Sequence, residues 1–106
     1  MKMVTAIINK KDAGKVCSAL VDAGFYFTKT ASSGGFLTIG NTTLIIGIED
    51  DKLNEVLDII RKHSSRRTET VTGMIGEAMT STVVPTQVIV GGATVFVTNV
   101  ELFEKM

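Results

Sequence analysis

The sequence has no excess of charge of either sign, since 11 basic residues balance 11 acidic ones. A neutral chain has no general electrostatic attraction to nucleic acid or to an anionic membrane. There is also no run of about 18 apolar residues, and no basic stretch leads into an apolar segment. The single cysteine, Cys17, cannot form an intramolecular disulfide. We therefore expect a cytoplasmic protein with no membrane insertion and no nucleic acid polymer as partner.

The sequence offers few candidates for catalysis or metal binding. Its only histidine, His63, has no second histidine or cysteine nearby, and it is expected at a helix C-terminus, where the helix dipole stabilises a cation. Cys17 has no partner at C-x-x-C spacing and is expected to be a small core residue. No Ser-His-Asp order or carboxylate pair stands out. We predict no catalytic residues, no metal site and no cofactor, and hence not an enzyme.

What the chain does have is apolar content, with 44% hydrophobic residues among 106. This length suits a single domain with one core, here assigned to residues 1–106. The opening "MKMVTAIIN" is apolar on both faces and reads as a central strand. A helix is predicted over about 12–23, with Asp12 as its cap and Gly24 in a left-handed conformation after its end.

Two strands, "FYFTKT" and "NTTLIIGIED", follow this helix and are joined by a glycine-rich segment. A second helix begins near Asp50 and Asp51 and shows the most regular apolar spacing in the chain. No periodicity is evident from Ser64 to Val84, so a long loop is expected at about 65–85. "TQVIV" and "ATVFVTNV" then read as two closing strands with a tight turn at Gly91 and Gly92.

This order of elements predicts an α+β fold of the ferredoxin-like type, the split β-α-β sandwich. Its antiparallel sheet would carry both helices on one face. The strands "MVTAII" and "TLIIGI" are apolar on both parities, so the other face would expose a large hydrophobic surface. Such surfaces are normally covered by partner subunits, and we therefore expect a homo-oligomer.

The segment "TASSGGFLTIGNTTLIIG" at residues 30–47 holds the strongest indication of a ligand. Gly34 and Gly35 could bring main-chain N–H groups to an anion, although the same residues could simply form a turn. Phe36 could stack on a base or fill the core. Asn41 suits an adenine edge, with a turn residue as the alternative, and Thr28 offers a hydroxyl from the adjoining strand.

These residues resemble a known family, the PII-like cyclic di-AMP receptor proteins of Gram-positive bacteria, and the resemblance runs from end to end. Its most specific motifs are "TK" at 28–29, "GGFL" at 34–37, "GNTT" at 40–43, Gly47, "DD" at 50–51 and "VGGATVFV" at 90–97. The resemblance implies a PII-like homotrimer with cyclic di-AMP held in clefts between subunits. The positions it implicates in ligand binding are Thr28, Gly35, Phe36, Leu37, Asn41, Gly47, Arg67 and Phe96. Tyr26 stands where the family commonly has arginine, and it could stack on adenine but supplies no cation.

The leading hypothesis is therefore a signalling receptor that binds cyclic di-AMP and orders the segment 65–85 for recognition by a downstream protein. One alternative is a PII-type trimer that binds another adenine nucleotide, ATP or ADP. Another is an interaction trimer whose ligand site has decayed, with Tyr26 as the trace of that loss. An enzyme is poorly motivated, because a ferredoxin-like fold by itself never settles function.

Overall fold

The structure is a computed structural model, and it describes residues 1–32, 40–74 and 83–106. The elements, in chain order, are β1 (Lys2–Asn9), α1 (Lys10–Asp22), β2 (Thr28–Ser32), β3 (Asn41–Ile48), the 3₁₀ turn η1 (Asp50–Lys52), α2 (Leu53–Ser64), β4 (Arg67–Met74), β5 (Val83–Val90) and β6 (Ala93–Asn99). Four of the strands form the main sheet, and β4 and β5 form a second, two-stranded sheet.

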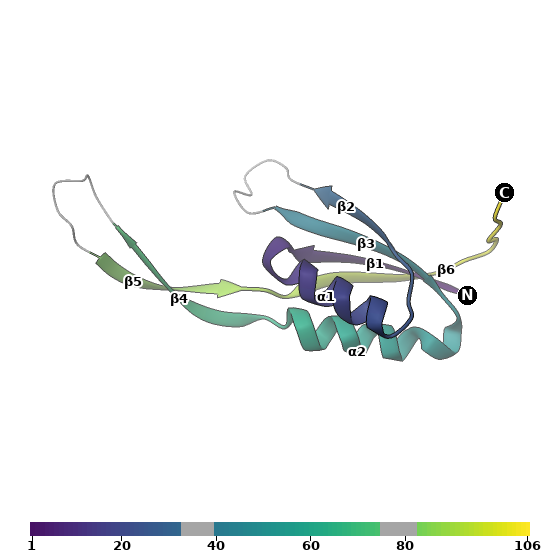
Figure 1. The fold of residues 1–106 in the computed structure, drawn as a ribbon, viewed down its shortest axis with the longest axis horizontal. Helices are drawn as coiled ribbons and strands as arrows, with labels where there is room; N and C mark the ends of the chain where they lie inside the picture. Colours follow the sequence, from purple (N-terminus) through teal and green to yellow (C-terminus); the bar gives the residue numbers. More distant parts are fainter. Residues whose placement is uncertain (33–39, 75–82) are drawn as a thin grey trace.

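The main sheet is antiparallel with the strand order β2-β3-β1-β6, and α1 and α2 pack on one of its faces (Figure 1). This is the strand order of a split β-α-β sandwich, because β3 lies between the two strands that α1 connects. The predicted α+β, ferredoxin-like fold is confirmed. Among the described residues, no helix has the length and apolar character needed to cross a membrane.

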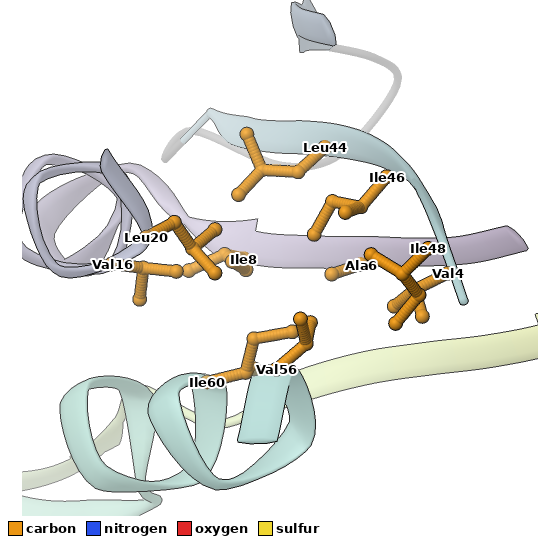
Figure 2. Close-up of a cluster of buried hydrophobic side chains, with 10 residues drawn as sticks. All are labelled: Val4, Ala6, Ile8, Val16, Leu20, Leu44, Ile46, Ile48, Val56 and Ile60. Carbon is orange, nitrogen blue, oxygen red and sulfur yellow. The ribbon is translucent and has the colours of Figure 1, made fainter. Parts of the chain in front are cut away.

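The hydrophobic core lies between this sheet and the two helices (Figure 2). Alternate residues of the strands face the helices, which places Val4, Ala6 and Ile8 of β1 in the core. The other members, from β3 and both helices, are Val16, Leu20, Leu44, Ile46, Ile48, Val56 and Ile60. Because the opposite parity of each strand points away from the helices, the second face of the sheet is left open.

The ends of α1 differ in part from the prediction. The helix begins at Lys10, and its cap is Asn9, whose side chain accepts from the Lys11 N–H at 2.8 Å. The assignment of Asp12 as cap is therefore wrong, because Asp12 lies in the first turn. The predicted left-handed Gly24 is confirmed at φ +86°, and the N–H of Phe25 donates to the Leu20 carbonyl at 2.9 Å, as in a Schellman motif.

The prediction of a loop at about 65–85 is wrong for residues 67–74 and 83–85, which belong to strands β4 and β5. β4 and β5 pair in an antiparallel arm that extends away from the main sheet, from Arg67 opposite Val90 to Met74 opposite Val83 (Figure 1). Threonine recurs in β4 and valine in β5, and these β-branched residues favour strands even without a helical or strictly alternating pattern. Residues 75–82 lie outside the described part of the chain.

The tight turn expected between the last two strands is also wrong as a hairpin. β5 pairs with β4, whereas β6 pairs with β1, so the link at Gly91 and Gly92 carries the chain from the arm to the main sheet. Both glycines have a left-handed backbone, at φ +80° and +85°, which glycine adopts without the strain other residues incur. The N–H of Gly92 donates to the carbonyl of Ser64 at 2.6 Å and fixes this link to the end of α2.

Candidate ligand-binding face

The face of the main sheet that the helices leave open carries apolar side chains among threonines. The strand register aligns Thr28, Ile45, Thr5 and Phe96 in one row across all four strands. In this row Ile45 is 40% exposed and Phe96 is 57% exposed. The next row along the strands is Thr30, Thr43, Ile7 and Thr94. This open face therefore combines apolar surface with a series of hydroxyl groups.

A hollow of about 600 Å³ lies at one end of the open face, and Tyr26, Thr28 and Gly47 line it together with residues of the C-terminal segment. This volume is in the range of small-molecule sites. Tyr26 is 91% exposed, so its ring lies at the surface of this hollow. The structure thus brings together three of the residues that the resemblance implicated or singled out.

Gly47 has no packing requirement within its own chain. A Cβ added there would meet no heavy atom within 4 Å, and the backbone does not adopt a positive φ. Glycine is therefore required here neither by the backbone conformation nor by close packing, and its missing side chain leaves open space over the sheet. This arrangement fits a position that is approached from outside the subunit.

A second hollow, of about 360 Å³, lies at the other end of the open face and includes Asn41. Asn41 begins β3 and pairs with Asn9 of β1 and Ser32 of β2. The two asparagines line the hollow with Thr94 and Arg66, so its walls are rich in hydrogen-bonding groups. Neither Asn9 nor Arg66 was predicted as a site residue.

Arg67 is not placed on the open face. Its Nη2 donates to Oδ1 of Asp12 at 2.9 Å, and its Nη1 donates to Oδ2 at 3.2 Å, in a bidentate pair with a carboxylate whose side chain is only 3% exposed. Nη1 also donates to the carbonyl of Ser65 at 3.3 Å. Arg67 is therefore not among the residues that line either hollow of the open face, although its Nη1 lies close to Gly91, which lines the hollow with Asn41.

Three further predicted site residues, Gly35, Phe36 and Leu37, lie outside the described residues, in the segment that connects β2 to β3. The C-terminal Leu102 and Phe103, by contrast, are described, and they line the first hollow at 78% and 61% exposure. Sequence reasoning missed both, although two large apolar residues after the last strand were a usable signal.

The electrostatic environment gives little sign of catalytic chemistry in the described part of the chain. Burial raises the pKa of the Cys17 thiol, and the nearby Lys29 offsets this only partly, so the thiol is a poor nucleophile. A hydrogen bond from the N-terminal ammonium lowers the pKa of Asp50. Across residues 1–32, 40–74 and 83–106, no three histidine, cysteine or acidic residues gather in a way that could hold a metal ion.

Two comparisons with known proteins bear on the family to which this chain belongs. A solved structure of a functionally unknown protein from Pediococcus pentosaceus superimposes with a TM-score of 0.81 and 42% sequence identity, covering 99% of this chain and 96% of that one. The family model described as "Cyclic-di-AMP receptor" matches residues 1–106, the whole of the chain. The chain therefore belongs to the cyclic-di-AMP receptor family.

Proposed function

We propose that this protein is a cytoplasmic receptor for cyclic di-AMP that acts as a homotrimer and passes the signal to a downstream protein. The observation that carries the proposal is the match of the receptor family over residues 1–106. This is a family of binding proteins, and the role proposed for this chain is binding without turnover.

The open face supports the proposed position of the ligand. Thr28, Asn41, Gly47 and Phe96 come from three different strands, yet the register places all four on this face. An adenine needs apolar or aromatic surface for its ring and an amide or hydroxyl group for its edge. Phe96 supplies the first and Asn41 the second, while Gly47 leaves space above the sheet. Gly35, Phe36, Leu37 and Tyr26 complete the proposed site, and Arg67, which lies beside Gly91 at the edge of the Asn41 hollow, stays a candidate.

The same face supports assembly into a homotrimer with the ligand between subunits. Met3, Ile45 and Phe96 are 37%, 40% and 57% exposed, although all three belong to strands of the main sheet and Ile45 and Phe96 lie in the middle of theirs. Contact with neighbouring subunits would remove this apolar area from water. Size-exclusion chromatography with light scattering measures the mass of the assembly. The trimer is expected to give three times the chain mass of 11.3 kDa, whereas a mass of 11.3 kDa would contradict it.

The relay to a downstream protein is assigned to the arm formed by β4 and β5. This arm extends from the main sheet and offers a surface that is separate from the open face (Figure 1). Ligand binding would favour one position of the segment 65–85 over others, and the partner would bind that position.

Calorimetric titration with cyclic di-AMP tests the proposal, with ATP and cyclic di-GMP titrated in parallel. We expect saturable binding of one cyclic di-AMP per subunit, and an Asn41→Ala variant is expected to bind about 5- to 100-fold more weakly because it loses a hydrogen bond to the ligand. Asn54→Ala, an exposed asparagine on α2, is the matched control and should bind like the wild type.

Each other result of this titration has a distinct meaning. Preferential binding of ATP would replace cyclic di-AMP by a different adenine nucleotide as the ligand. The absence of heat with all three nucleotides would indicate a decayed site. Equal affinity of the wild type and the Asn41→Ala variant would contradict the assignment of Asn41.

A further inference from the structure

Two consecutive arginines, Arg66 and Arg67, have different surroundings in the structure. Ser65, the residue after α2, has an extended backbone at φ −62° and ψ 143°, and successive side chains of an extended chain point to opposite sides. Arg67 turns toward the buried carboxylate of Asp12. Arg66 is exposed and makes no hydrogen bond or ion pair with any described residue, so its guanidinium donors are available.

Arg66 lines the polar hollow at the Asn41 end of the open face. Its stem packs beside Gly92, where an added Cβ would lie 3.6 Å from the Cβ of Arg66. Asn9, Asn41 and Thr94, which carry side-chain amide and hydroxyl groups, also line the hollow. Among the described residues that line it, none is acidic. A cation surrounded by neutral donors, without a carboxylate to neutralise it, is suited to an anion.

We propose that Arg66 binds a phosphate of the cyclic dinucleotide, with Asn9 as a second donor beside it. This inference rests on the proposed function, and it assigns the anion contact to Arg66 instead of Arg67. Guanidinium binds phosphate oxygens through two parallel N–H donors, a geometry that lysine cannot reproduce.

The two hollows on the open face are compatible with one extended ligand. Asn41 and Ile45 mark their positions on β3, and four residues of a strand span about 13 Å. A molecule with two adenosines and two phosphates can contact both ends of the face at once. One adenosine then lies toward Tyr26 and Thr28, while a phosphate lies beside Arg66.

Titration of cyclic di-AMP into Arg66→Ala and Arg66→Lys variants tests this assignment. Arg66→Ala is expected to weaken binding about 10- to 100-fold and to reduce the dependence of affinity on salt. Arg66→Lys keeps the charge but loses the paired donors, so its affinity should fall between the two. Arg61→Ala is the matched control, since it removes the same side chain and charge from an exposed pair with Asp58. Thermal unfolding of each variant checks that the fold is retained.

The outcomes separate this inference from the function on which it rests. Binding by the wild type and by Arg61→Ala, with a loss in Arg66→Ala, supports the phosphate contact. Binding by the wild type with equal affinity in both alanine variants overturns the role of Arg66 and leaves the receptor function intact. No binding by the wild type overturns both.

Discussion

The ion pair between Asp12 and Arg67 leads to a prediction that separates a structural role of Arg67 from a ligand-binding one. The pair joins the first turn of α1 to the first residue of β4, at the point where the arm leaves the main sheet. The Asp12 side chain is 3% exposed, and the Arg67 side chain is 37% exposed. Arg67→Ala would leave a buried carboxylate without its cation.

The expected cost follows from this unequal burial. Breaking a fully buried ion pair by removing one partner costs about 3–5 kcal/mol, because the remaining charge stays buried and unpaired. Since more than a third of the Arg67 side chain contacts solvent, part of this cost is screened. We expect Arg67→Ala to lower the free energy of unfolding by about 2–3 kcal/mol. The double variant Asp12→Ala/Arg67→Ala should recover part of this loss, because it leaves no buried charge.

Urea unfolding followed by circular dichroism measures this free energy, at one protein concentration because assembly changes apparent stability. Arg61→Ala, which breaks an exposed pair with Asp58 whose side chains are 70% and 73% exposed, is the control and should cost less than about 1 kcal/mol. If Arg67→Ala is as stable as this control and instead loses affinity for cyclic di-AMP, Arg67 is a ligand-binding residue and our reasoning is refuted.

Two further predictions concern the glycines and the cysteine. Gly91→Ala and Gly24→Ala both place alanine at a positive φ, which costs about 1–2 kcal/mol, but only at Gly91 would the new Cβ lie 2.7 Å from an Arg67 nitrogen. Gly91→Ala should therefore be clearly the less stable variant in the same urea assay, and equal stabilities would contradict the close packing. Because burial raises the pKa of Cys17, its thiol should react with iodoacetamide at pH 8 more slowly than in urea-unfolded protein, and equal rates would argue against this burial.

Much of the main sheet and both helices could be predicted because their signals are local. The second helix follows from apolar residues spaced three and four apart, and the structure places Val56 and Ile60 of this set in the core. The end of the first helix follows from Gly24, whose left-handed conformation is observed. Local signals of this kind do not depend on which segments meet in the fold.

The arm could not be predicted in the same way because its local signals are weak. β4 and β5 form a two-stranded sheet, and their sequences show no strict alternation of apolar and polar residues that would identify a strand with one buried face. Valine and threonine were the available signal, but they indicate strands only weakly. The same limit explains the wrong hairpin at Gly91 and Gly92, since two adjacent glycines can turn a chain within one sheet or carry it between two.

The candidate site shows a further limit of prediction from the sequence, because the surroundings of two adjacent arginines could not be told apart. The sequence places Arg66 and Arg67 side by side, and nothing in their composition or spacing distinguishes them. Their surroundings differ because the chain continues in an extended conformation after α2 ends, so that Arg66 lines the Asn41 hollow and Arg67, the next residue, pairs with Asp12. The end of α2 therefore decides which arginine stabilises the base of the arm and which one is available to a ligand on the open face.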